Sequence, residues 1–389
     1  MNKVEELLAQ LCPNGVEFKE LGEVVKVLRG RRLTRNQLTP DEKYPVFHGG
    51  LEPLGYYGQS NRTANTVMVI NVGASAGTVG FSSVDFWSSD GCFCISHSDI
   101  VISKFLYYSL IIQENTLKSK VRKAGIPTLD SLVILNFQIP IPPLPIQQEI
   151  VSILDKFTQL EAELEAELEA RRAQYNYYQN DLLNFEGKEV EWKTLGEVGQ
   201  FVRGNGLQKS DFSESGVGCI HYGQIYTYFG FSANKTKTFV TPELAKKLRK
   251  AKKGDLVIAT TSENIEDVCK TVVWLGEEEI AISGETYIFT HNQNAKFIAY
   301  YLKTPTFLAF KKQNITGTKV IRVHGDKLKQ FKIPIPPIEE QERIVRILDK
   351  FDVLVNDISV GLPAEIKARR KQYEYYRGKL LDFKSISNG

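Results

Sequence analysis

The chain has 389 residues, of which 42% are hydrophobic and 24% are charged, and its formal net charge is +3. This composition is that of a globular, weakly basic protein with room for two ordinary domains and connecting helices. The five cysteines include no Cys-x-x-Cys pair, which argues against a zinc site or a disulfide framework. Because no signal peptide and no apolar run long enough to span a bilayer are evident, we expect a cytoplasmic protein with no membrane partner.

The first 138 residues predict a helical stub followed by a globular domain. Residues 1–15 contain the pair Leu7–Leu8 and resemble the tail of a helix that recurs later in the chain. Residues 16–138 are predicted to form the first domain. Within it the apolar run Asn65–Gly73, bounded by Gly, Asn and Ser residues, predicts a strand. Lys104–Ser119 has apolar residues at helical spacing and predicts a helix, so the domain is expected to be mixed α/β.

Residues 139–189 are predicted to leave this domain and form a long helix. The Ile-Pro-Ile-Pro-Pro segment at its start excludes a helix and favours an extended backbone. Ile146–Phe185 then carries apolar residues at steps of three and four, which is typical of a coiled coil. Such a helix would extend roughly 60 Å. Its stretch Leu160–Ala170 repeats Leu-Glu-Ala-Glu, and we expect these glutamates to be solvated and not to lie against any phosphate, because like charges repel.

Residues 190–332 and 333–389 are predicted to repeat this plan. In the second domain Gly254–Ser262 predicts a strand and Ala295–Gln313 predicts a helix. The second proline-rich exit leads into a C-terminal helix, which the Gly361–Pro363 segment should break or kink.

Parts of the two halves are nearly identical in sequence. The segment Ile139–Phe157 recurs as Ile333–Phe351, and Val16–Val24 recurs as Val190–Val198. The sequence therefore predicts a mixed α+β fold, in which two globular α/β domains are separated by two long antiparallel coiled-coil helices with a pseudo-twofold internal repeat. The residues predicted to line the helix pair or a partner interface are Ile150, Ile153, Phe157, Leu160, Leu164, Tyr175, Tyr178, Ile344, Ile347, Phe351, Leu354, Tyr373 and Tyr376.

Polar and aromatic residues gather in glycine-bearing loops of both domains. Arginine can read guanine, asparagine or glutamine can read adenine, and nearby cations can hold phosphates, although ordinary surface loops would have a similar composition. The candidate DNA-binding residues are Arg29, Arg31, Arg32, Arg35, Asn36, Gln37, His48, Tyr56, Tyr57, Asn61, Arg62, Arg203, Asn205, Gln208, Lys209, His221, Tyr222, Gln224 and Tyr226. Buried structural roles are an equally good interpretation of the two histidines.

Sequence signatures of catalysis are few. Gly204-Asn205-Gly206 lacks the third glycine of a dinucleotide loop, and no phosphate-binding loop ends in Gly-Lys-Ser/Thr. The five histidines have no metal-ligand spacing, and no Asp/Asn-Pro-Pro-Tyr/Phe motif of an adenine methyltransferase is present. We therefore expect a binding protein with no catalytic and no metal-ligating residues.

The proline-rich exits, the helix start QxxIVxILDKF and the helix end ARRxQYxYYxxxLLxF resemble the specificity subunits of type I restriction-modification systems. The phrases IHYGQIYTYFG, GYYGQSNR and GASAGTVGF resemble the target-recognition domains of that family. The resemblance implies that each domain reads one half of a bipartite double-stranded DNA target. It also implies that the helices dock two methyltransferase (modification) subunits and set the gap between the half-sites, and that restriction subunits join the full complex. S-adenosylmethionine, ATP and Mg are then expected on those partners, with no cofactor bound by this chain.

Two other classes of function stay open at the level of sequence. One is a self-contained enzyme, such as a nuclease with an unrecognised site, and the other is a bivalent protein-binding adaptor. Methylation assays with and without a methyltransferase partner would separate the first from a specificity subunit. The salt dependence of binding to duplex DNA would separate the second.

Overall fold

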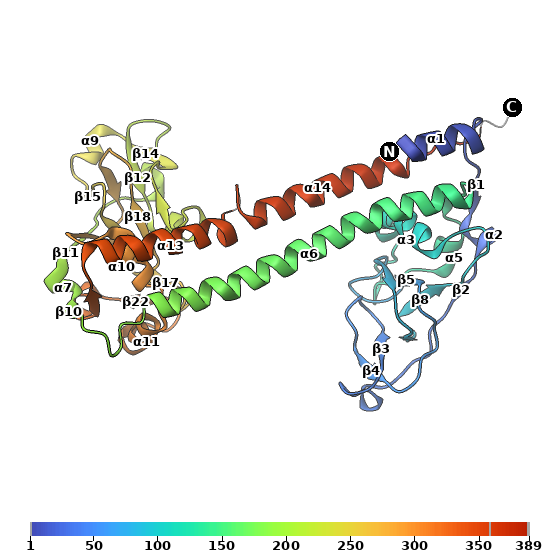
Figure 1. Cartoon of the computed structure of the whole chain (residues 1–389), viewed down its shortest axis with the longest axis horizontal. Coiled ribbons are helices and arrows are strands. Elements are labelled where there is room, and N and C mark those ends of the chain that lie inside the picture. Colours follow the sequence, from blue (N-terminus) through green and yellow to red (C-terminus); the bar gives the residue numbers. More distant parts are fainter. Residues whose placement is uncertain (1, 358, 387–389) are drawn as a thin grey trace. The chain divides into compact units, whose positions relative to one another are not determined.

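The computed structural model describes residues 2–357 and 359–386, and the chain divides into two compact units. The first unit comprises residues 1–166 and 365–389, and the second comprises residues 167–364. Helix α6 (Leu144–Leu182) begins in the first unit and ends in the second, and helix α14 (Leu362–Leu380) runs from the second into the first. Figure 1 shows each unit as a mixed globular domain with helices packed on it, as the sequence predicts.

The first unit is built on an antiparallel sheet with strand order β2-β8-β5-β6. A smaller sheet has the order β4-β3-β7, with β3 and β7 parallel, and β1 pairs with β9. The strands are β1 (Phe18–Glu20), β2 (Val27–Leu28), β3 (Tyr44–Phe47), β4 (Gly55–Tyr57), β5 (Thr66–Ile70), β6 (Val79–Ser82), β7 (Trp87–Ser88), β8 (Cys92–Ile95) and β9 (Gln138–Pro140). The helices before α6 are α1 (Asn2–Leu11), α2 (Leu21–Val24), η1 (Arg35–Gln37), α3 (Ser103–Ile112), α4 (Glu114–Ser119) and α5 (Ser131–Leu135).

The second unit repeats this arrangement with additions. Its main sheet has the order β11-β20-β16-β18-β13, its smaller sheet the order β14-β12-β19-β15, and β10 pairs with β23 as β1 pairs with β9. A further sheet has the order β17-β22-β21. The strands are β10 (Glu191–Thr194), β11 (Gly199–Arg203), β12 (Val217–Ile220), β13 (Ser232–Ala233), β14 (Thr238–Val240), β15 (Lys250–Ala251), β16 (Leu256–Ala259), β17 (Thr261–Ser262), β18 (Thr271–Trp274), β19 (Ile280–Ile282), β20 (Thr286–His291), β21 (Ile315–Thr316), β22 (Ile321–Val323) and β23 (Lys332–Ile335). The helices are α7 (Leu195–Val198), η2 (Lys209–Asp211), α8 (Tyr222–Thr227), α9 (Pro242–Ala245), α10 (Ala295–Tyr301), α11 (Pro305–Asn314), α12 (Gly325–Leu328) and α13 (Ile338–Asn356).

The central strands β5 and β16 are buried on both faces. Because successive side chains of a strand point to opposite faces, Val67 and Val69 pack into the core that contains α3. Met68 and Ile70 pack into a second cluster with residues of β3 and β8. Strand β16 alternates in the same way between the core with α10 and a cluster with α8. These two strands confirm the apolar runs that predicted them.

Two predicted helices are each broken in the structure. The helix predicted over Lys104–Ser119 divides into α3 and α4 at Gln113, and the Glu114 carboxylate, at the start of α4, accepts a hydrogen bond from the backbone N–H of Val79 at 3.0 Å. The helix predicted over Ala295–Gln313 divides into α10 and α11, because a proline at position 305 cannot continue the first helix and begins the second. Both predictions were wrong in assuming one continuous helix.

The long helical segments follow the prediction closely. Helix α6 is continuous, whereas its second copy divides into α13 and α14 at the Gly361–Pro363 segment. In the first unit α6 packs antiparallel against α14, with Phe157 stacked on Tyr376 at 5.6 Å between ring centroids. In the second unit α6 packs against α13, with Tyr178 stacked on Phe351 at 5.4 Å. The predicted antiparallel pairing of the helices is therefore confirmed within each unit.

A buried glutamine fixes the start of each helix copy to its globular domain. The Gln147 side chain accepts a hydrogen bond from the backbone N–H of Ile102 and donates to the carbonyls of Ile100 and Pro142, all at 2.7–2.8 Å. Gln341, at the equivalent position of α13, accepts from the backbone before α10 and donates to the carbonyl of its own proline-rich exit. Both glutamines are fully buried.

An aspartate further along each helix forms a second set of contacts with the globular domain. Asp155 accepts a hydrogen bond from the Tyr108 hydroxyl at 2.5 Å and lies 3.5 Å from the Lys104 ammonium. In the second unit the equivalent contacts to Asp349 are those of Tyr300 at 2.8 Å and Lys296 at 2.6 Å. We name these glutamines and aspartates, with their partners, the polar joint. Its positions are the same in both units, with one difference in partner: Gln341 donates to the Gln293 side chain where Gln147 donates to the Ile100 carbonyl.

Candidate nucleic-acid interface

In each unit the polar loop begins at a glycine, and the two glycines have the same close contact with a backbone carbonyl. Gly30 follows β2 and Gly204 follows β11, and each lies against a backbone carbonyl. A Cβ atom would lie 1.9 Å from the Ser89 oxygen at Gly30 and 2.1 Å from the Ser283 oxygen at Gly204. Only glycine permits so close an approach. The candidate loops therefore leave equivalent points on a shared backbone.

In the first unit several candidate side chains of this loop are free to meet a ligand. These exposed residues, whose side chains form no hydrogen bond or ion pair with any described residue, are Arg31, Arg32, Arg35 and Asn36. The Tyr56 side chain is also exposed, at 37%. Three unpaired guanidinium groups within a few residues suit contacts with phosphates or base edges.

The other candidates in the first unit support these loops. The Arg62 guanidinium donates to the carbonyls of Asn61 and Arg29, at 2.6 and 2.7 Å. The Asn61 amide exchanges two hydrogen bonds with the backbone of Ser88. The Arg29 guanidinium lies over the Phe93 ring at 5.9 Å. These polar groups are committed within the chain, which favours a structural role for them.

The side chains of three further candidates of this unit each make a contact within the chain. The Gln37 side chain accepts hydrogen bonds from Thr34 and so caps η1. The Tyr57 ring packs edge-on against Trp87. His48 Nδ1 accepts a hydrogen bond from the backbone N–H of Gly91 at 3.1 Å and lies 3.2 Å from the Asp90 carboxylate.

In the second unit Asn205 joins its loop to a strongly basic segment. Its amide donates to the Lys247 carbonyl at 2.9 Å and accepts from the Arg249 backbone N–H at 2.8 Å. Next to it Gln208 and Lys209 are exposed at the start of η2. The exposed cations of the adjoining segment, which we name the basic segment, are Lys246, Lys247, Arg249, Lys250, Lys252 and Lys253. The loop pattern did not predict this segment, although the run of lysine and arginine in the sequence signals it.

The remaining candidates from the second unit surround helix α8. His221 is 7% exposed, and its Nδ1 accepts the backbone N–H of Gly223. Burial and the nearby Lys209 charge lower the pKa of His221, so it stays neutral. The Gln224 side chain is bonded to the His221 backbone N–H and to Thr238. The half-buried Tyr222 ring lies 4.5 Å from the imidazole. The structural interpretation is therefore the better one for His221 and Gln224.

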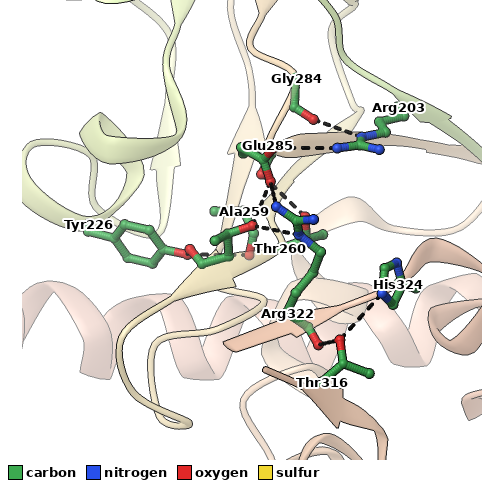
Figure 2. A network of polar contacts seen from close by, with 10 residues as sticks. Arg203, Tyr226, Ala259, Thr260, Gly284, Glu285, Thr316, Arg322 and His324 are labelled. Carbon is green, nitrogen blue, oxygen red and sulfur yellow. Dashed lines mark hydrogen bonds and ion pairs between the residues drawn. The ribbon is translucent and has the colours of Figure 1, made fainter. Parts of the chain in front are cut away.

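A carboxylate and two arginines form the most developed polar cluster of this unit (Figure 2). Glu285 Oε2 lies 2.7 Å from Arg322 Nη2 and accepts a hydrogen bond from the Thr261 hydroxyl at 2.7 Å. Its Oε1 lies 3.4 Å from Arg203 Nη2. Tyr226 donates to the Thr261 carbonyl at 2.8 Å, so this candidate positions the cluster. Burial alone would raise the pKa of Glu285, but the Thr261 hydrogen bond and the two guanidinium charges outweigh it and lower that pKa.

The predicted helix residues divide between core and surface. Ile150, Tyr175 and Ile344 are buried, whereas Leu160 is 46% and Tyr178 37% exposed. The half-buried members are Ile153, Phe157, Leu164, Ile347, Phe351, Leu354, Tyr373 and Tyr376.

The apolar stripe also omitted residues that matter. Leu154 and Leu348 are fully buried at equivalent positions of α6 and α13, and both lie within the repeated ILDKF phrase. Tyr177 and Tyr375, at equivalent positions of the helix ends, are 67% and 64% exposed. Two of the repeat glutamates, Glu161 and Glu165, form ion pairs with Arg370 of α14. Their charges are therefore partly used inside the helix pair and are not only solvated.

Among the described residues, no helix has the length and apolar character needed to cross a membrane, and no group of three or more His, Cys, Asp or Glu side chains is placed to hold a metal.

The family described as type I restriction modification DNA specificity domain matches residues 13–170 and 187–368. The chain is 36% identical over 297 residues to the type I restriction enzyme EcoR124I/EcoR124II specificity subunit of Escherichia coli, covering 73% of this chain and 72% of that protein. It is 29% identical over 393 residues to a putative type I restriction enzyme specificity subunit of Haemophilus influenzae, covering 95% and 96%. The crystal structure of the S subunit of a type I system from M. genitalium has the same fold, with a TM-score of 0.62, 17% identity and coverage of 94% and 96%.

Proposed function

The chain belongs to the family of DNA specificity subunits of type I restriction-modification systems, and we propose that each of its two units reads one half of a bipartite double-stranded DNA target. The observation that carries this proposal is a shared backbone with different exposed side chains. Gly30 and Gly204 start equivalent loops, yet one loop continues with three arginines and the other adjoins the basic segment. A scaffold that keeps its geometry while its surface side chains differ suits the reading of two different base sequences.

The exposed cations are assigned to the DNA backbone and the less charged polar side chains to base edges. In the first unit Arg31, Arg32 and Arg35 are free to contact phosphates, and Asn36 to contact a base. In the second unit the basic segment supplies the phosphate contacts. The sites of both units bind one partner, duplex DNA.

The helices are assigned to the docking of two methyltransferase subunits, and restriction subunits join that assembly. One exposed tyrosine per helix copy, Tyr177 and Tyr375, supports this proposal, because exposed tyrosines are enriched in protein interfaces. Methyl transfer and DNA cleavage then belong to the partners. S-adenosylmethionine, ATP and Mg would be held there, and the compartment of the whole complex would be the cytoplasm.

Catalysis by partners is tested with the purified chain. On unmodified DNA, with or without S-adenosylmethionine and Mg, the chain alone should neither methylate nor cleave. Adding the methyltransferase subunit should produce sequence-specific methylation. Reproducible turnover by the chain alone would favour a self-contained enzyme, and salt-insensitive binding with no preference for DNA would favour a protein adaptor.

Modular reading is tested by exchanging a domain. Residues 16–138 are replaced by the corresponding domain of a relative, and methylated sites of the assembled complex are mapped across a genome. One half of the recognised sequence should change and the other should stay, because the polar joint attaches each domain separately. A change in both halves would contradict the proposal.

A further inference from the structure

The internal repeat identifies positions where the two units share a backbone but differ in side chain. In the first unit Thr128 forms a backbone bridge to Arg122, and in the second unit Arg322 forms one to Thr316. Both hairpins span the same number of residues, and they are separated by the same offset as Ile139 and Ile333, 194 residues (333 minus 139). Thr128 and Arg322 therefore occupy equivalent positions.

Two neighbouring positions can be matched in the same way. The strand partner of Thr128 is Val72, and that of Arg322 is Thr261. The glycine contacts align Ser89 with Ser283, so the residues two places later also correspond. The three matched positions hold Thr128, Val72 and Gly91 in the first unit and Arg322, Thr261 and Glu285 in the second. None of the three carries a charge in the first unit, so the backbone does not require the charged cluster of the second.

The cluster leaves specific donors of Arg322 unused. Nε donates to the Thr261 hydroxyl at 3.2 Å and Nη2 to Glu285 at 2.7 Å. A guanidinium has five N–H donors, so both hydrogens of Nη1 and one of Nη2 have no partner within the described residues. The free Nη2 hydrogen and one Nη1 hydrogen point in parallel from the end of the planar group, which is the free edge. The adjacent edge, formed by Nε and Nη2, is held by two side chains, which fixes the orientation of the free edge.

We propose that Arg322 reads a guanine in the second half-site through this free edge, with Glu285 as the residue that positions it. The inference rests on the proposed function, since it assigns a base contact to the second unit. Two parallel hydrogen bonds from an arginine to O6 and N7 of guanine are the commonest specific contact in the major groove. Arg203, the last residue of β11, binds the same carboxylate just before the candidate loop begins.

The ion pair between Arg322 and Glu285 makes Arg322 better suited to contacting a base than a phosphate. Arg322 is 38% and Glu285 31% exposed, so the pair is accessible to DNA while partly shielded from water. The carboxylate, which Arg203 shares, offsets part of the charge that would attract a phosphate but leaves the directional donors in place. Lys246, Lys247 and Arg249 of the basic segment, which form no ion pair within the described residues, are better suited to phosphates. A fixed, partly neutralised guanidinium is better suited to reading a base edge.

The test uses the complex with its methyltransferase subunit. Methylated sites are first mapped for the wild-type complex to define both half-sites, and the exchange of residues 16–138 identifies which half belongs to the second unit. Binding is then measured to duplexes that carry the target or single-base substitutions in that half. Arg322→Ala and Arg322→Lys should each lose about 5- to 150-fold of the discrimination at one guanine, since lysine keeps the charge but not the paired donors. Glu285→Gln should lose part of it, with discrimination in the first half-site unchanged.

Arg249→Ala is the matched control. It removes an exposed cation of the same unit and should weaken binding to all duplexes equally. The inference is overturned if the second half-site contains no guanine, or if all three variants keep wild-type discrimination in a folded complex. It is also overturned if Arg322→Lys restores full discrimination, because Arg322 would then act by charge alone. A wild-type complex without a bipartite target would instead overturn the proposed function. Thermal unfolding of each variant, with retained first half-site reading, shows that the fold is intact.

Discussion

Neutralising the basic segment should reduce the salt dependence of DNA binding without altering the sequence that is read. The combined variant Lys246→Ala, Lys247→Ala and Arg249→Ala removes three exposed side chains that form no ion pair among the described residues. Each phosphate contact contributes roughly 0.9 to the slope of log K against log salt, so the slope should fall by up to about 2.7. At 0.1 M salt this corresponds to a loss of about two to three orders of magnitude in affinity.

The assay is fluorescence anisotropy of the complex with its methyltransferase subunit, on target and random duplexes over a range of salt concentrations. Both duplexes should lose affinity by the same factor, because phosphate contacts carry no sequence information. Lys371→Ala is the control, an exposed cation on α14, where the neighbouring Arg370 pairs with glutamates of α6. An unchanged slope, or a loss confined to the target duplex, would refute the assignment of this segment to phosphates.

Three other outcomes are expected. Gln147→Ala should destabilise the first unit by about 3 kcal/mol in chemical unfolding, because it leaves buried backbone groups without partners, whereas Gln159→Ala on the exposed face of α6 should have little effect. Burial lowers the pKa of His291 to about 4, so as the pH falls below about 6.5 the imidazole is protonated in the unfolded chain before it is protonated in the folded one. The free energy of unfolding should therefore drop by up to about 3 kcal/mol between pH 7 and pH 4. The variant His291→Asn should show a smaller drop over the same pH range. Deleting Leu164–Glu167 shortens α6 by roughly 6 Å and turns it by only about 40°, so genome-wide mapping of methylation should show both half-sites unchanged with a gap shorter by one to two base pairs, and an unchanged gap would show that α6 does not set the spacing.

Much of the fold could be predicted because it depends on periodicity and repetition. The apolar runs predicted β5 and β16, and the spacing of apolar residues predicted α6 and its pairing. The Gly361–Pro363 segment predicted the break between α13 and α14. Each of these signals lies within a short window of sequence, where backbone sterics and side-chain periodicity act directly.

The site was harder to predict because polar side chains serve either the fold or a ligand. Asn205, Gln224 and Arg62 have the residue types that read bases, yet the structure uses their polar groups to hold loops. Conversely, Glu285 and Arg322 lie 37 residues apart in the sequence, and only the folding of the chain brings Glu285, just before β20, beside Arg322 of β22. Composition cannot distinguish these cases, since they differ only in which partners the fold supplies.

The polar joint explains how the two reading surfaces can differ so much. The buried Gln147 satisfies its hydrogen bonds with backbone atoms of its own unit, and Gln341 does so with backbone atoms and the Gln293 side chain. A substitution on an exposed loop that leaves Gln293 in place therefore changes no partner of these two glutamines, and surface changes of this kind usually cost less than about 0.5 kcal/mol. A substitution within the joint leaves buried groups unpaired and costs several times more. The sequence around the joint is nearly identical in both halves, while positions such as Thr128 and Arg322 differ, so under the proposed role of Arg322 a change of specificity would need no new fold.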